Sequence, residues 1–190
     1  MKKITTLMTL ALMAVLSLSF TACDEDDEIA YTLEGTWQGD MYVSHEWNGV
    51  EYDATYSEIC FVRDSYSYSS GTGYWVDYYK NAGWGRNYVA NHIEWKVNFG
   101  RIEVYFVEED ALICIEDYRL NDNYFSGTIY DNGNQVNFSL RHVSSPNWYG
   151  IDYWGWDTYY YAKENNTWTR ANEAKADSVA APKRIFRSNR

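Results

Sequence analysis

Hydrophobic and polar residues alternate along most of the chain between residues 33 and 143. The alternation is strictest over 93–98 and 136–141, where every second residue is aliphatic or aromatic. A period of two places one set of side chains on the dry face of a strand and the other set on its wet face. The pattern predicts eight strands, at residues 34–45, 51–62, 66–79, 91–98, 101–107, 111–120, 124–131 and 135–143.

Short turn sequences separate these predicted strands. Asn-Gly pairs at 48–49 and 132–133 favour tight hairpins, because both central residues tolerate a positive φ. Phe-Gly at 99–100 and Asp-Asn at 122–123 make similarly short returns. Short links force neighbouring strands to be antiparallel, and eight such strands close into a barrel. We therefore expect an all-β fold, an eight-stranded antiparallel up-and-down barrel, with a sandwich of two four-stranded sheets as the alternative.

In such a topology alternate loops share one end of the barrel. The links near 48–49, 80–91, 108–110 and 131–134 would form one mouth, and those near 63–66, 99–100 and 121–123 the other end. The first strand starts at the second end and the last strand finishes there. We expect that end to be the closed one and the mouth to point away from whatever anchors the N-terminus.

The start of the first predicted strand carries a recognisable motif. Leu-Glu-Gly-Thr-Trp at residues 33–37 resembles the Gly-x-Trp opening of lipocalins and the wider calycin group. This resemblance covers about residues 33–143 and is strongest to the lipocalin-like domains of bacterial surface lipoproteins. It implies that Trp37 plugs the closed end of the barrel and that Arg141 packs across it. The family binds varied small apolar ligands, so the resemblance implies no particular activity.

The N-terminus has the layout of a secretory signal. Lys2 and Lys3 precede an apolar run over 7–20, which is too short to span a bilayer as a helix. Phe-Thr-Ala-Cys at residues 20–23 resembles a bacterial lipobox, in which the cysteine is acylated and becomes the new N-terminus. We predict a lipoprotein signal peptide over 1–22 and lipidation at Cys23.

An acidic linker, residues 23–32, follows the cleavage site. Its run Asp-Glu-Asp-Asp-Glu at 24–28 is typical of a solvated spacer. It also resembles the acidic signal by which some gut Gram-negative bacteria send lipoproteins to the cell surface. We expect an outer-membrane lipoprotein exposed at the surface. The formal net charge of −11 argues against nucleic acid as a partner, because phosphates would repel it.

Two cysteines remain besides Cys23. An exported chain with Cys60 and Cys114 could form one disulfide. The predicted strands that carry them are not neighbours, and bridged Cα atoms lie within roughly 7 Å of each other. Two separate apolar thiols are the alternative.

The predicted mouth carries one long loop over 80–88. Trp84 lies between two glycines that would let its ring move, with Arg86 and Tyr88 close behind. A mobile indole beside a guanidinium suits stacking on a sugar or a planar ligand. In the other interpretation Trp84 folds back onto the barrel.

After the barrel domain, residues 33–145, comes an aromatic-rich extension over 146–169. Its foremost side chains are Trp148, Trp154, Trp156 and Tyr160. They could cap the closed end, form a platform for a glycan or peptide, or rest at lipid headgroups.

Residues 159–163 and 167–170 within this extension could pair as a further hairpin. The rest, 170–190, is rich in Ala, Ser, Asn and charge. Its composition predicts a basic, disordered tail.

Catalytic motifs are poor. His45, His92 and His142 fall in separate strands without metal-ligand spacing, and no serine lies in a Gly-x-Ser-x-Gly elbow. We expect no enzyme activity, no cofactor and no metal.

Two functions compete. One is the binding of a small apolar or carbohydrate ligand at the mouth. The other is a structural or interaction role, in which a filled barrel docks a protein partner or cell-envelope surface through its aromatic extension. Large inward side chains would favour the second; the candidates are Trp95, Phe99, Phe106 and Phe138.

Overall fold

The computed structural model describes residues 25–85, 87–131, 133–144, 161–164, 167–170 and 182–187. A helix over 25–33 precedes the first strand. The strands are β1 (Gly35–Asp40), β2 (Val43–Trp47), β3 (Val50–Asp53), β4 (Tyr56–Arg63), β5 (Ser70–Tyr78), β6 (Tyr88–Asn98), β7 (Arg101–Phe106), β8 (Ala111–Asn121), β9 (Tyr124–Asp131), β10 (Asn134–Ser144), β11 (Tyr161–Glu164), β12 (Thr167–Arg170) and β13 (Lys183–Phe186).

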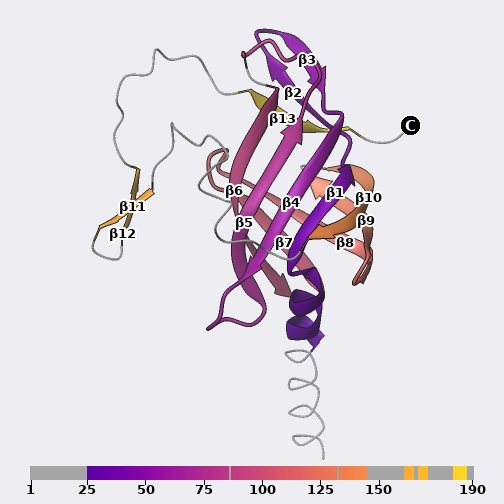
Figure 1. The fold of residues 1–190 in the computed structure, drawn as a ribbon, viewed down its shortest axis with the longest axis vertical. Helices are drawn as coiled ribbons and strands as arrows, with labels where there is room; N and C mark the ends of the chain where they lie inside the picture. The colour runs from indigo at the N-terminus through magenta and orange to yellow at the C-terminus, as the bar shows by residue number, and fades with distance from the viewer. Residues whose placement is uncertain are drawn as a thin grey trace, which may run out of the picture.

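Eight of these strands close into an antiparallel barrel (Figure 1). Around the barrel the order is β1, β4, β5, β6, β7, β8, β9 and β10, which pairs again with β1. The expected all-β fold with a closed eight-stranded barrel is confirmed. The alternative of two packed sheets is wrong, because the strand pairing runs round the barrel without a break.

The first two predicted strands each divide in two. Residues 34–45 become β1 and β2, and residues 51–62 become β3 and β4. The chain turns at Tyr42, which has a φ of 51° and whose N–H donates to Asp40 Oδ1 at 2.7 Å. As a result the β2–β3 hairpin, with its expected turn at 48–49, leaves the barrel wall and pairs with β13 in a separate three-stranded sheet.

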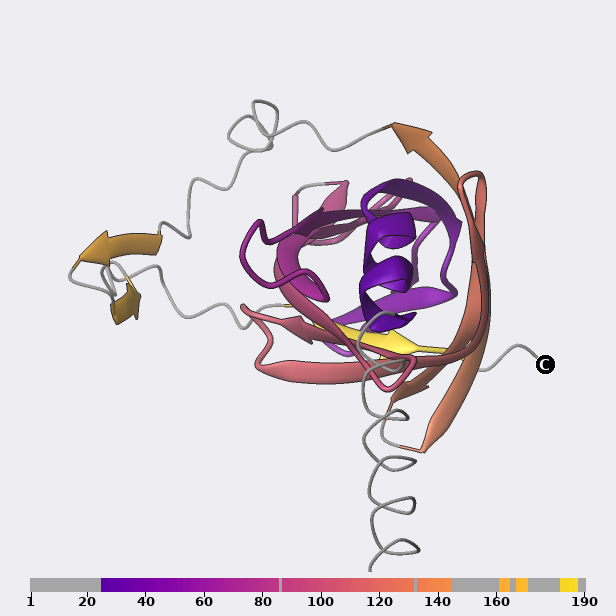
Figure 2. The ribbon, with the colours of Figure 1, turned by 90° about the horizontal axis from the view of Figure 1, so that it is seen from below.

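The two ends of the barrel carry different segments. The end with the β2–β3 hairpin, the β5–β6 loop and the turns β7–β8 and β9–β10 is here called the upper end. The opposite end, called the lower end, carries helix 25–33, the β4–β5 loop and the turns β6–β7 and β8–β9. Figure 2 shows the helix lying across the lower opening. This division of the loops agrees with the division expected from the sequence.

Large buried rings fill the barrel interior. Neighbouring centroids lie 4.9–5.7 Å apart in four pairs: Trp37–Phe125, Phe125–Phe138, Phe61–Trp95 and Trp75–Phe106. Phe99, which we expected to point inward, is 85% exposed. It lies in the β6–β7 turn with a φ of 51°, so the strand alternation no longer applies to it.

The helix closes the lower end by apolar and polar contacts together. Leu33 is fully buried and its carbonyl accepts a 2.8 Å hydrogen bond from Trp37 Nε1. The Asp26 carboxylate accepts the two backbone N–H groups of the turn 99–100 at 2.9 and 2.8 Å. The acidic segment expected to be a spacer is therefore, from residue 25 onward, a helix attached to the barrel.

Trp37 is fully buried at the lower end, but Arg141 does not pack across it. Arg141 is exposed, because the inward positions of β10 are Phe138, Leu140 and then His142. The His142 ring lies 5.0 Å from the Trp37 ring. Gly35, with a φ of 140°, leaves room for this imidazole, since a Cβ there would overlap it. The expected Trp37–Arg141 pair is thus a Trp37–His142 pair.

The cysteines do not form a bridge. Cys60 on β4 and Cys114 on β8 are free thiols on opposite sides of the barrel. Burial raises the pKa of both thiols, so neither is a reactive thiolate at neutral pH.

Besides the β2–β3 hairpin, the described residues form two further strand pairings outside the barrel. β11 and β12 pair in register from Tyr161–Arg170 to Glu164–Thr167, as the predicted hairpin requires. β13 belongs to the segment expected to be a disordered tail, yet it pairs antiparallel with β2. The alternation of β13 places Arg184 and Phe186 on one face of the strand. Burial of that face explains why this segment forms a strand.

Candidate functional site

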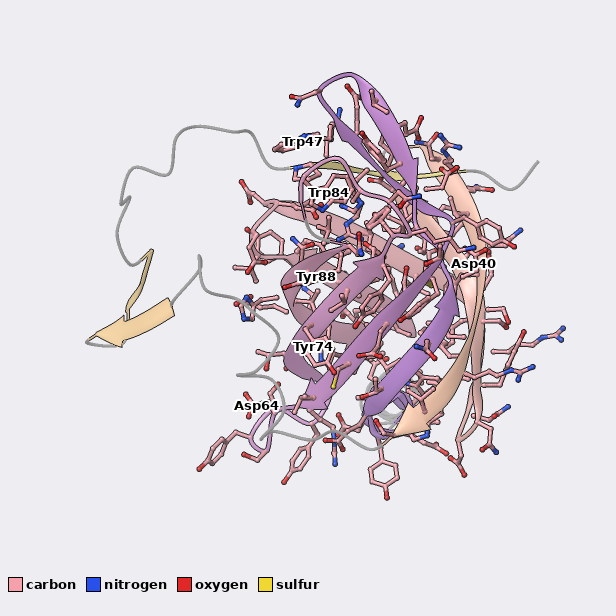
Figure 3. The ribbon with its side chains drawn as sticks, turned by 45° about the horizontal axis from the view of Figure 1, so that its top comes forward. Asp40, Trp47, Asp64, Tyr74, Trp84 and Tyr88 are labelled. Atoms are coloured by element: carbon pink, nitrogen blue, oxygen red, sulfur yellow. The ribbon has the colours of Figure 1, made fainter. Side chains whose placement is uncertain are left out.

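Trp84, the expected contact at the mouth, lies against the β2–β3 hairpin. Its ring centroid is 4.9 Å from that of Tyr79, 5.3 Å from Tyr52 and 6.4 Å from Trp47. Its Nε1 donates to the Tyr88 carbonyl at 3.2 Å. Figure 3 shows Trp84 and Trp47 together at the upper end. Trp84 therefore adopts the folded-back arrangement, and its ring helps to hold the hairpin over the barrel.

Trp84 and Tyr88, two of the three residues expected to form one ligand site, pack their side chains against different clusters. Tyr88 starts β6, and its side chain packs against a second apolar cluster on the outer face of the barrel. We call this group the outer-wall cluster; it consists of Cys60, Val62, Tyr74 and Val76. Trp84 instead contacts the hairpin. Arg86 lies outside the described residues, as do Trp148, Trp154, Trp156 and Tyr160 of the expected aromatic platform.

The upper end holds a buried arginine from β13. The Arg184 side chain is only 3% exposed, and its Nη1 is paired with Asp77 Oδ2. Its Nε donates to the two Glu109 carboxylate oxygens at 3.1 and 3.3 Å, and its Nη2 donates to Asn91 Oδ1 at 2.7 Å. We call Asp77, Asn91 and Glu109 the guanidinium site. A buried charge is tolerated only when it is paired and hydrogen-bonded, and here every nitrogen of the fork has a partner.

The barrel itself orients the guanidinium site. The other oxygen of Asp77 accepts hydrogen bonds from Ser57 Oγ at 2.5 Å and Trp75 Nε1 at 2.9 Å. The Arg184 guanidinium also stacks over Phe106, with Cζ 4.4 Å from the ring centroid. The hydrogen bonds hold the Asp77 carboxylate in place. The Phe106 ring provides a flat surface that suits a planar guanidinium better than an ammonium group.

Glu109 and Arg184 stabilise each other's charged forms at this site. Burial is the largest influence on Glu109 and opposes its ionisation, but Arg184 and His45 together outweigh burial and hold the pKa of Glu109 below its usual value. Burial likewise opposes the charge on Arg184, and Asp77 and Glu109 raise the Arg184 pKa above its usual value. At neutral pH the ionised Glu109 carboxylate therefore faces the guanidinium.

His45 lies beside the same cluster and is fully buried. Its Nδ1 is hydrogen-bonded to the Tyr79 hydroxyl. Its Nε2 has no hydrogen-bond partner among the described residues, and Glu109 Oε1 lies 3.9 Å away. Burial lowers the pKa of His45, so the ring is neutral at pH 7. One polar atom next to the guanidinium site is thus unused.

A signal for this site was present in the sequence but was not recognised. Asp77 lies two residues after Trp75 on β5, so both side chains point into the barrel. A single carboxylate on the buried face of a strand requires a charged or hydrogen-bonding partner from another part of the chain. The partner, Arg184, stands in a segment whose composition predicted disorder.

A second feature is an open groove of about 880 Å³ on the outer wall. It is lined by residues of β4 to β8 and of the β4–β5 loop, among them Arg63, Thr72, Glu94, Lys96, Glu103 and Tyr105. Within this lining, Lys96 on β6 and Glu103 on β7 form an ion pair, with Nζ and Oε2 3.0 Å apart. Val62 belongs both to this groove and to the outer-wall cluster.

Within the described ranges, no three His, Cys, Asp or Glu side chains are placed to share a metal ion. Across the same ranges, no helix has the length and apolar character needed to traverse a bilayer. Comparison with known proteins gives no match to a family model, to a curated protein or to a solved structure.

Proposed function

We propose that this chain is a lipid-anchored, surface-exposed, non-catalytic lipoprotein that binds its ligand on the outer wall of a filled barrel. In this proposal the barrel is of the up-and-down, lipocalin-like kind and is anchored through Cys23. The observation that carries the proposal is the contrast between an interior occupied by packed rings and an open groove outside it.

The interior leaves little support for a ligand at the mouth. Trp37 contacts Phe125 towards the lower end, and Trp75 contacts Phe106 near the upper end, where β13 adds Phe186. All five rings belong to one buried core cluster. Protein interiors packed in this way contain few voids larger than a water molecule. A small apolar ligand would have to displace core side chains.

The chemistry of the groove suits a carbohydrate. Its wall presents a tyrosine ring, a threonine hydroxyl, carboxylates and an ammonium group within one concave surface. Sugars are bound by such combinations of a flat aromatic face and several polar groups. A protein partner is the second candidate, because the groove also presents the exposed side chain of Leu112 among its charged groups.

Exposed aromatic residues support an anchor at the lower end. Tyr31 is 68% exposed, Tyr66 93%, Tyr68 59% and Phe99 85%, and all four lie on the helix, loop and turn of that end. Aromatic rings favour the headgroup level of a bilayer. Cys23 would stand directly before the helix that crosses the same end, so the upper end would face outward.

The test measures binding of a panel of glycans to residues 24–190. Intrinsic tryptophan fluorescence and calorimetry detect the binding. We expect a saturable response that Tyr105→Ala weakens at least about tenfold, since an aromatic contact contributes on the order of 1–2 kcal/mol. Tyr130→Ala, on the outer face of β9 away from the groove, is the matched control and should change nothing. Absence of any saturable response, or an equal loss in both variants, would exclude the groove as a glycan site.

A fluorescent fatty-acid probe tests the filled barrel separately. We expect no binding to the wild-type domain. Stoichiometric binding that is lost when an interior position is enlarged would mean that the barrel holds its ligand inside.

A further inference from the structure

β13 is held at the upper end by two side chains that point into the barrel. Arg184 enters the guanidinium site, and Phe186, 3% exposed, lies 5.9 Å from Trp75 and 6.5 Å from Phe106 by ring centroids. The backbone of β13 pairs antiparallel with β2, with Arg184 opposite His45. A strand added to a sheet edge, with pockets for alternate side chains, is the arrangement by which many domains bind extended peptides.

On the exposed side of β13, a basic side chain also meets acidic side chains of the hairpin. Arg187 contacts Glu51 Oε1 through Nη2 at 2.6 Å and Asp53 Oδ1 through Nη1 at 3.1 Å. Its backbone N–H donates to the Tyr42 carbonyl at 2.9 Å. Carboxylates therefore meet the strand on its buried and on its exposed side, which complements a basic peptide.

The walls of this site come from a part of the chain that is remote in sequence from the strand that fills it. Every contact named for β13 is made by residues 42–109, whereas β13 itself is reached only after residues 145–182. Asp77 is also held by hydrogen bonds from Ser57 and Trp75, two side chains of the barrel itself. The barrel thus presents a preorganised half-site, and preorganisation favours binding of a separate ligand.

The chain's own strand does not use the whole site. His45 Nε2 is buried next to Glu109 and has no hydrogen-bond partner among the described residues. A peptide with a different polar side chain beside the arginine would satisfy this atom.

We propose that the upper end is a binding site for an extended peptide that carries an arginine and, two residues later, an aromatic residue. In this structure residues 183–187 occupy the site from within the same chain. The peptide is supplied by residues 183–187 of a second copy of this chain, because that segment is the one the structure shows to fit the site. It must displace the tethered strand, which competes at a high effective concentration. This site is separate from the outer groove and does not depend on the function proposed for that groove.

The test uses the mature chain with a protease recognition sequence placed within residues 171–181. After cleavage of the folded protein, a fluorescein-labelled peptide of residues 182–190 is added and its anisotropy is followed. We expect saturable exchange, one peptide per chain, and binding at least about tenfold weaker to the uncut protein, where the tether competes. A peptide with Arg184→Gln should bind at least about a hundredfold more weakly, as expected for loss of a charged, bidentate contact. The matched control is Lys183→Gln, at an exposed position, which should bind within about threefold of the original.

Three results would overturn the proposal. The cut protein could fail to exchange its strand with the peptide, it could bind the Arg184→Gln peptide as well as the original, or it could unfold when the strand dissociates. The last result, seen by circular dichroism, would make β13 part of the core. Light scattering of the uncut chain over a range of concentrations tests the source of the strand. Concentration-dependent dimers support a second copy, and a monomer at every concentration would exclude it.

Discussion

The two ends of the barrel are closed by different central contacts. At the lower end the helix immediately before β1 covers the opening, and Leu33, Trp37 and His142 pack there largely as apolar surface. At the upper end a strand from the far end of the chain inserts a charged side chain, Arg184, between Asp77 and Glu109.

This difference has consequences for how each end can open. Apolar packing is non-directional and is lost in proportion to the area exposed, so the lower end has no simple switch. A buried ion pair depends on both partners, and removal of either leaves an uncompensated charge. The upper end is therefore the end that a substitution, a proton or a competing peptide can release while the rest of the barrel stays folded.

The largest effect is expected at the lower end. Trp37→Ala removes a fully buried indole together with its hydrogen bond to the Leu33 carbonyl. The free energy of unfolding should fall by about 3–5 kcal/mol, the usual cost of such a cavity. Urea denaturation of residues 24–190 measures it, with the exposed Tyr66→Ala as control. A loss below about 1 kcal/mol would mean that the lower end is not a structural closure.

At the upper end Arg184→Gln should cost less, about 2–3 kcal/mol, because the strand can leave and let water reach the carboxylates. Arg184→Lys keeps the charge but loses the planar fork, and should recover only part of the loss. Hydrogen exchange separates the ends: amides of β2 should exchange faster in Arg184→Gln while amides of β1 and β10 stay protected. Equal acceleration throughout the barrel would show that the two ends open together.

The pH dependence of stability should come mainly from the upper end. Burial lowers the folded-state pKa of His45 below 6.5, so the unfolded chain binds that proton first and stability falls as the pH drops below about 6.5. Arg184 keeps the pKa of Glu109 below 4.5, so a second loss follows as the pH falls through that lower value. His45→Phe should abolish the first step in a series of urea midpoints. If the step persists in that variant, another group is responsible.

The smallest effect on stability is expected from the exposed aromatics of the lower end. Tyr66→Ser and Phe99→Ser should each change the free energy of unfolding by less than about 0.5 kcal/mol, as is usual at exposed sites. If the lower end faces the membrane, the double variant with both substitutions should nevertheless associate less with phosphatidylcholine vesicles than unmodified residues 24–190 do. Co-sedimentation measures this association. The exposed Leu112→Ser, on the wall near the upper end, is the control and should leave association unchanged.

Sequence reasoning succeeded where structure is local. The period of two, together with turns such as Phe99–Gly100, was sufficient for eight barrel strands and for the assignment of each loop to an end. The expectation for Arg141 is wrong, because the alternation of β10 directs residue 141 outward and His142 inward, towards Trp37.

By itself, the sequence determined the all-β fold, the short antiparallel returns, the hairpin at 48–49 and the burial of Trp37, since these follow from alternation and from the φ preferences of a few turn residues. Only the tertiary structure decided that the first two strands bend away at Tyr42, that the interior is filled by rings, and that β13 returns to the upper end. The guanidinium site belongs to this second group: Asp77, Glu109 and Arg184 meet through pairings between strands far apart in sequence, and no local preference encodes such a meeting.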